Sequence, residues 1–189
     1  MVGWIVLAIF LLVLLGVALY AILIYNGFIQ MRNNADKSWS NIDVLLKQRF
    51  DELPKLIKVC EGYMQHEQKT LEAVIRARAM VASAGSDKEK LQAQNMLTDT
   101  LRSLFAVAES YPDLKADAIF QRLGYRISEL EDMIADRREL FNETVNLYNI
   151  RLEQFPDVVV ARLFNFTGRS LWRIDPAHRQ DVEVKFQHA

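Results

Sequence analysis

Residues 1–25 read MVGWIVLAIFLLVLLGVALYAILIY, and this stretch decides how the rest of the chain is interpreted. It is almost wholly apolar, and the first charged side chain in the sequence is that of Arg32. A bilayer core of roughly 30 Å requires about 20 apolar residues in a helix. The stretch therefore predicts an N-terminal transmembrane helix, followed by a chain of soluble character.

We expect this helix to be kept as an anchor and not removed as a signal peptide. A signal peptide has a basic region before a shorter apolar run and ends in a small-x-small site. Here no Lys or Arg precedes the run, and Tyr20 spoils the small-x-small match that begins at Ala18. The residues predicted to hold the anchor in the membrane are Trp4, Phe10, Leu14, Tyr20 and Tyr25, with aromatic rings near both ends, where the headgroups lie.

The charges that follow the apolar stretch predict its orientation. Basic residues close to a span favour the cytoplasmic side, and four of them follow the span: Arg32, Lys37, Lys47 and Arg49. We therefore expect the N-terminus outside and the large C-terminal part in the cytoplasm. The whole chain has 23 basic and 24 acidic residues and no basic block, which argues against nucleic acid as a partner.

Apolar periodicity predicts long helices behind the anchor. A stripe spaced by three and four residues, as in coiled coils, runs from Trp39 to Val81, so a first helix is expected from about residue 26 to 81. Pro54 predicts a kink within this helix, and a reversal there is the less favoured alternative. Cys60 lies on the stripe, which predicts a packed thiol and not a reactive one.

Turn and cap residues divide the remainder. Gly85 suits a left-handed helix end, and Ser86 with Glu89 forms a capping-box pattern that starts a second helix. Pro112 ends that helix. A third helix is expected from about residue 116 to 155, with Asp113 as a candidate cap.

After Pro156 we expect a short fourth helix to residue 164. The predicted fold is therefore all-α: a transmembrane helix (1–25) continues into an antiparallel bundle of three long helices plus the short fourth (26–164), followed by an extended tail (165–189). Residues 181–186 alternate polar and apolar side chains, as a short strand does. Tyr148 and Asn149 are candidates for holding the tail.

The first helix is predicted to be about 84 Å long and the second about 36 Å, so the second cannot cover the whole of the first. Apolar side chains without intrachain cover indicate an interface. The tail adds large apolar residues that are costly to expose, so we expect it to dock on the bundle or on a second copy. The predicted interface residues are Ile42, Leu46, Phe50, Trp172, Val184 and Phe186.

The sequence carries little that predicts catalysis. His66 and Glu67 begin a zinc-protease pattern, but Thr70 stands where the second His is required. Nucleophile and phosphate-loop motifs are missing, so we expect no catalytic, cofactor or metal site. The charged run at 129–139 is interpreted as a solvated face, and Gly124 as a close contact between helices.

Several segments resemble the LemA family of bacterial membrane-anchored helical proteins. They include Ser38-Trp39-Ser40-Asn41-Ile42-Asp43-Val44, Leu46 to Pro54, Gly62 to Glu67, Tyr111 to Ala116 and Phe155-Pro156, in the family's order. The resemblance implies an N-terminal span in the bacterial inner membrane, a helical bundle and no catalytic residues. It also implies relatives of a MamQ-like branch linked to magnetosome membranes.

Taken together, the sequence predicts a non-catalytic, membrane-anchored scaffold that self-associates and organises membrane lipid or other envelope proteins. The alternative is an adaptor or sensor subunit that presents a helical surface to another membrane protein.

Overall fold

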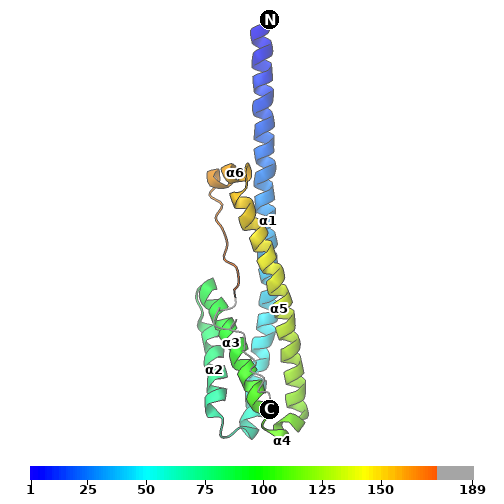
Figure 1. The fold of residues 1–189 in the computed structure, drawn as a ribbon, viewed down its shortest axis with the longest axis vertical. Coiled ribbons are helices and arrows are strands. Elements are labelled where there is room, and N and C mark those ends of the chain that lie inside the picture. Colours follow the sequence, from blue (N-terminus) through cyan, green and yellow to red (C-terminus); the bar gives the residue numbers. More distant parts are fainter. Residues whose placement is uncertain (174–189) are drawn as a thin grey trace, which may run out of the picture. The chain divides into compact units, whose positions relative to one another are not determined.

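A computed structural model of the chain describes residues 1–173, except for the side chains of Asp87 and Lys88. Its helices are α1 (Val2–Tyr63), α2 (Gln68–Ser83), α3 (Asp87–Ala108), α4 (Pro112–Ala116), α5 (Ala118–Glu153) and α6 (Asp157–Leu163). The described residues hold no strand, which confirms the all-α class (Figure 1). The expected strand at residues 181–186 lies outside the described residues.

The chain divides into two compact units. Of the described residues, 1–44 and 135–171 form unit 1, and 45–134 with 172 and 173 form unit 2. Both α1 and α5 contribute to each unit, because the unit boundaries fall inside these helices.

The first helix does not run to Val81. It continues through Pro54 and ends at Tyr63, and a turn at residues 64–67 leads into α2. Met64 is buried in this turn, whereas Gln65 and His66 are exposed. The apolar stripe misled the prediction because the side chains on both sides of the turn, such as Cys60 and Leu71, face the same core.

The connection between α2 and α3 confirms one prediction and corrects another. Ser86 Oγ accepts the backbone N–H of Glu89, and the Glu89 carboxylate accepts the N–H of Ser86, which is the predicted capping box. Gly85 does not adopt a left-handed conformation. Ala84 leaves α2 in an extended conformation instead, and the Gly85 N–H donates to Glu89 Oε2 at 2.9 Å.

The connection between α3 and α5 is capped by a different residue from the one predicted. Pro112 starts the single turn of α4 and does not open α5 directly. Asp117, not Asp113, caps α5, because its Oδ1 accepts the backbone N–H groups of Ile119 and Phe120 at 2.8 and 2.9 Å. These hydrogen bonds, that from Phe120 first, lower the pKa of the Asp117 carboxyl.

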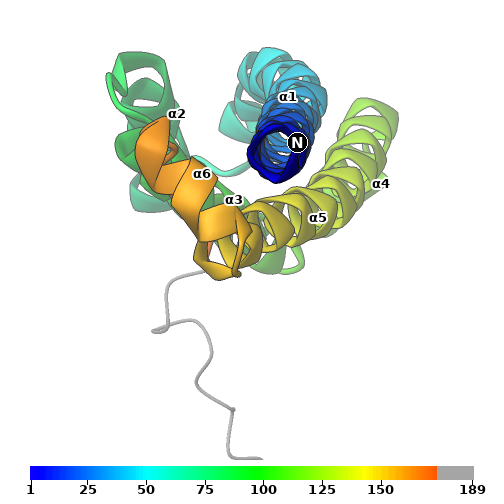
Figure 2. The same ribbon diagram turned by 90° about the horizontal axis from the view of Figure 1, so that it is seen from above.

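Unit 2 is a helical bundle built from residues 45–63 of α1, α2, α3, α4 and the first part of α5. Its apolar core is continuous and includes Leu53, Cys60, Leu97, Leu104 and Ile127. Helices α2 and α3 lie side by side in both ribbon views (Figures 1 and 2). Cys60 is fully buried, as predicted, and burial raises the pKa of its thiol to about 11.

Unit 1 contains the apolar N-terminal part of α1, the last part of α5 and α6. The view along α1 shows the end of α5 and α6 on one side of α1 (Figure 2). The predicted short fourth helix is confirmed as α6. Residues 164–171 follow it without regular structure.

Candidate functional site

The candidate site lies in unit 1, where the apolar part of α1 ends. α1 contains a segment long and apolar enough to cross a membrane, and none of that segment is buried within the chain. The predicted anchor residues Trp4, Phe10, Leu14 and Tyr20 are all exposed. Ala21 and Tyr25 are half-buried and Ile24 is buried, so the rest of unit 1 begins to cover the helix within the last turn of the apolar stretch.

A small apolar core surrounds α1 at this point. We call it the span-end cluster; its buried residues are Ile24, Phe28, Tyr148, Val160 and Ala161, packed by Ala21, Tyr25, Met31, Leu152 and Phe166. Phe28 is at its centre. Its ring stacks on Phe166 with a centroid distance of 5.0 Å and meets Tyr148 edge-on at 6.2 Å. The cluster therefore joins α1, α5, α6 and the segment after α6.

Arg151 of α5 lies against the backbone of α1 at Gly27. A Cβ placed on Gly27 would lie only 2.6 Å from Arg151 Nη1, so the absence of a side chain makes room for the guanidinium. Arg151 also forms an ion pair with Asp157, at the start of α6. The guanidinium carbon is 5.4 Å from the centre of the Phe28 ring, within the range of a cation–π interaction. Gly27 thus lets the guanidinium lie against the α1 backbone, where it contacts α1 and α6 together.

The end of α6 turns the chain back onto the cluster. Asn165 has a φ of 55°, the left-handed conformation that Asn tolerates better than most residues. The Phe166 N–H donates to the Ala161 carbonyl at 2.9 Å, and the Asn165 N–H donates to the Arg162 carbonyl at 3.3 Å. This pair of hydrogen bonds is a Schellman motif, and it directs Phe166 into the cluster.

Two α5 residues hold the segment after α6, as the sequence predicted. Tyr148 Oη donates to the Thr167 carbonyl at 3.1 Å. The Asn149 side chain donates to the Arg169 carbonyl and accepts the Arg169 N–H, both at 2.9 Å. Burial raises the pKa of the Tyr148 hydroxyl, so it remains a donor. Arg169 in turn forms an ion pair with Asp36, which links the segment after α6 to α1 as well.

Unit 2 contains a buried polar group that the sequence analysis missed. The Arg49 side chain is buried, and its guanidinium donates to Thr98 Oγ1 at 2.8 Å, to Gln94 Oε1 and to Glu131 Oε1. Arg49 falls in a seven-residue repeat with the buried α1 positions 28, 35, 42 and 56. This register could have identified Arg49 as a residue on the buried face of α1. Glu131 therefore turns inward, unlike the solvated face predicted for residues 129–139.

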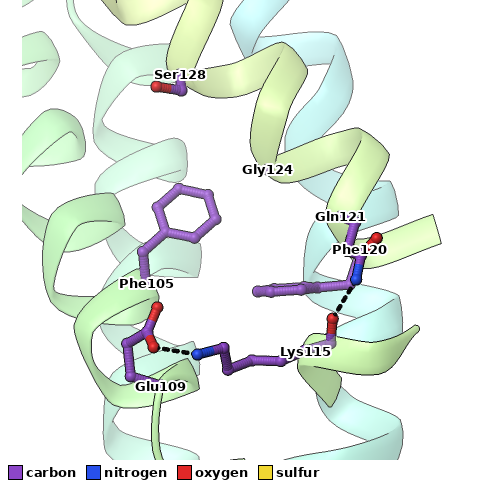
Figure 3. Close-up of a pocket in the computed structure, with 7 residues that line it drawn as sticks. All are labelled: Phe105, Glu109, Lys115, Phe120, Gln121, Gly124 and Ser128. Atoms are coloured by element: carbon purple, nitrogen blue, oxygen red, sulfur yellow. Dashed lines mark hydrogen bonds and ion pairs between the residues drawn. The ribbon is translucent and has the colours of Figure 1, made fainter. Parts of the chain in front are cut away.

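A groove between α3 and α5 of unit 2 has a volume of about 490 Å³. The rings of Phe105 and Phe120 line it, with the Glu109–Lys115 ion pair at one end and Ser128 at the other (Figure 3). A Cβ on Gly124 would lie 3.5 Å from the Phe105 ring, an ordinary van der Waals distance, so the structure shows no approach of the two helices that requires glycine there. Among the described residues, no three His, Cys, Asp or Glu side chains gather as metal ligands.

The predicted interface residues are covered by the chain itself. Ile42 and Leu46 are buried, and Phe50 is half-buried with the Arg78 guanidinium carbon 4.2 Å from its ring centre. The premise that they lack intrachain cover is therefore wrong, and for Phe50 the covering Arg78 comes from α2, the helix added by the turn after Tyr63. Trp172 docks as expected: its indole is buried and Nε1 donates to Asn95 Oδ1 at 3.0 Å. Val184 and Phe186 lie outside the described residues.

Comparison with known proteins gives a consistent set of relatives. The LemA family model matches residues 38–186. Magnetosome protein MamQ of Magnetospirillum gryphiswaldense is 23% identical over 179 residues, covering 81% of this chain and 66% of its own length. Magnetosome protein MamQ 2 of Paramagnetospirillum magneticum is 25% identical, with the same coverage of both chains. Protein LemA of Metamycoplasma hominis is 24% identical over 160 residues, which cover 84% of this chain and 73% of that protein. The chain thus spans just under two thirds of the length of the MamQ relatives.

Proposed function

This chain belongs to the LemA family, and from that premise we propose that it is a non-catalytic, membrane-anchored scaffold that holds helical surfaces at the membrane. The span-end cluster carries this proposal. Phe28 of α1, three residues after the end of the apolar stretch, is buried together with Tyr148 of α5 and Val160 of α6. Because α5 and α6 pack directly on the anchor helix, the end of α5 and α6 are held on the span-bearing helix and are not joined to it by a flexible linker.

The proposed location is a bacterial inner membrane, crossed once. The basic residues after the span favour an N-terminus outside and a C-terminal part in the cytoplasm. Two relatives are named as magnetosome proteins, which supports a role in organising a bacterial membrane. The names of these relatives mention no enzymatic activity.

We place the self-association surface of this scaffold on the outer face of α5 in unit 1. Leu140 and Leu147 are seven residues apart and Ile150 follows three later, and these side chains are 43%, 51% and 44% exposed. Residues with this spacing form one stripe on a helix, as at the seam of a coiled coil. The opposite face of α5 is already occupied, since Phe141, Val145 and Tyr148 are buried.

Disulfide cross-linking in native membranes tests this surface. The only native thiol, that of Cys60, is buried and has a raised pKa, so we do not expect it to form cross-links. We expect Leu147→Cys to cross-link into dimers on mild oxidation, and Asn146→Cys, exposed on the flank of the same turn, to cross-link far less. A monomer for both variants, together with a monomeric mass of the parent protein in native nanodiscs, would refute self-association.

The groove beside Phe105 and Phe120 supports the alternative function, an adaptor for another membrane protein. Two aromatic rings in an open groove suit an apolar side chain of a partner. The same nanodisc mass measurement separates the two functions. A second protein at fixed stoichiometry without a homo-oligomer favours the adaptor, provided that Gly124→Leu, which fills the groove, abolishes its binding.

A further inference from the structure

We propose that α6 lies in the membrane–water interface and inserts one edge among the lipids, as a second contact with the bilayer beside the span. The inference rests on the proposed anchoring of the chain. The inserted edge consists of Val159 and Leu163 of α6 together with Phe155, which lies two residues before the helix; we call it the α6 edge.

The α6 edge is apolar and uncovered. Phe155, Val159 and Leu163 are 84%, 58% and 74% exposed, and they recur every four residues, so Val159 and Leu163 share one face of the helix. The other side of α6 is used, because Val160 and Ala161 are buried in the span-end cluster. The helix therefore has one face for the protein and one apolar face without cover in the chain.

Phe164, the residue after the last one of the α6 edge, contacts the end of the span. The ring of Phe164, which is 51% exposed, lies 4.8 Å from the ring of Tyr25, the last residue of the apolar stretch. Phe28 and Gly27, which hold α6 through the cluster and Arg151, come only two or three residues after Tyr25. At about 1.5 Å per residue this is a displacement of about 5 Å along α1. Such a distance keeps α6 within the boundary between headgroups and acyl chains, where interfacial helices lie about 5–10 Å deep.

The charges around α6 fit lipid headgroups. Arg162 is exposed beside Leu163, and Arg32 is exposed just after the span. The acidic Asp157 is neutralised by its ion pair with Arg151. An apolar edge flanked by arginines is typical of helices that lie on anionic membranes. Because α1 crosses the bilayer, lipid already surrounds the chain close to α6. No further protein is needed to cover the α6 edge.

Fluorescence quenching in nanodiscs tests the proposal with the full chain. Single cysteines at Leu163, Val159, Leu14 and Asp136, in a Cys60→Ala background, are labelled with a polarity-sensitive fluorophore. The discs contain phosphatidylcholine and phosphatidylglycerol, with or without lipids that carry a nitroxide near the headgroup. Leu14 lies in the span and reports anchoring. Asp136 is an exposed residue of unit 1 about 28 Å before Phe155 along α5, and it is the aqueous control.

We expect the labels at Leu163 and Val159 to be quenched by the nitroxide lipids severalfold more than the label at Asp136 and to be shielded from aqueous iodide. Quenching of Leu163 no stronger than that of Asp136, while Leu14 is quenched, overturns the interfacial position of α6 and leaves the anchor intact. Shielding from iodide without quenching by lipid also overturns it, because a protein then covers the edge. An unquenched label at Leu14 refutes the anchor, and with it the premise of the inference.

Discussion

Replacing Gly27 by alanine tests how unit 1 is attached to the anchor. On helix propensity alone, Gly27→Ala stabilises α1 by about 0.8–1 kcal/mol. The new Cβ, however, would lie 2.6 Å from Arg151 Nη1, so the guanidinium must shift, and we expect this shift to take it out of reach of its partners. It then loses a charge-assisted hydrogen bond to Asp157, about 1.5–3 kcal/mol, and the interaction with the Phe28 ring, about 0.5–1 kcal/mol. The losses outweigh the gain, and a net destabilisation of about 1–3 kcal/mol is expected.

Hydrogen–deuterium exchange in nanodiscs measures this effect locally. Since about 1.4 kcal/mol corresponds to a factor of ten, amides of residues 157–166 are expected to exchange roughly 5- to 150-fold faster in Gly27→Ala than in the parent protein. Gly16→Ala is the matched control, because nothing lies within 4 Å of a Cβ at that position of the same helix. If Gly27→Ala left these amides as protected as Gly16→Ala does, the packing of Arg151 on the glycine would not hold α6 in place.

Three further predictions concern other contacts of the chain. Glu131→Gln is expected to lower the thermal midpoint of the protein, because buried Arg49 keeps its charge and loses its ion-pair partner; an exposed control, Glu129→Gln, is expected to change it little, and equal effects would contradict the assignment. Asn165→Gly is expected to retain stability within a few tenths of a kcal/mol and Asn165→Ala to lose about 1 kcal/mol in chemical denaturation, because only a residue that accepts a positive φ fits the Schellman motif. For Asp117, the lowered pKa means that its carboxylate stabilises the fold fully above the unfolded pKa near 3.8 and loses this effect as the pH falls through the folded pKa. Denaturation of Asp117→Asn and parent from pH 6 to pH 2.5 is therefore expected to show a difference that is constant above about pH 5 and shrinks below it, and a difference independent of pH would be inconsistent with the cap.

The anchor, the all-α class and several local caps could be predicted because each depends on neighbouring residues. Ser86 and Glu89 satisfy backbone groups only three positions apart, so their pattern is sufficient. The turn at residues 64–67 could not be found in this way. An apolar stripe identifies which side chains face a core, but it does not indicate whether the helix reverses between them, and Cys60, Met64 and Leu71 face one core on both sides of the turn.

The candidate site was predicted only in part for a related reason. Tyr148 and Asn149 were identified because polar residues near a helix end commonly bind the following segment. The role of Gly27 depends on Arg151, which is 124 positions away, and no local pattern connects them. The seven-residue register places Arg49 on the buried face of α1, but its partners Gln94 and Glu131 lie on other helices, and no local pattern connects them to it.

The rigid packing of α6 on the end of the span is tested most directly by a distance between α6 and the span. Spin labels at Leu19 of the span and Leu163 of α6, both exposed, can be measured by pulsed electron paramagnetic resonance in nanodiscs with Cys60 replaced by alanine. A single narrow distance distribution is predicted, because the span-end cluster fixes α6 on α1. A broad distribution would mean that the helical part moves freely relative to its anchor, and would contradict the scaffold proposed here.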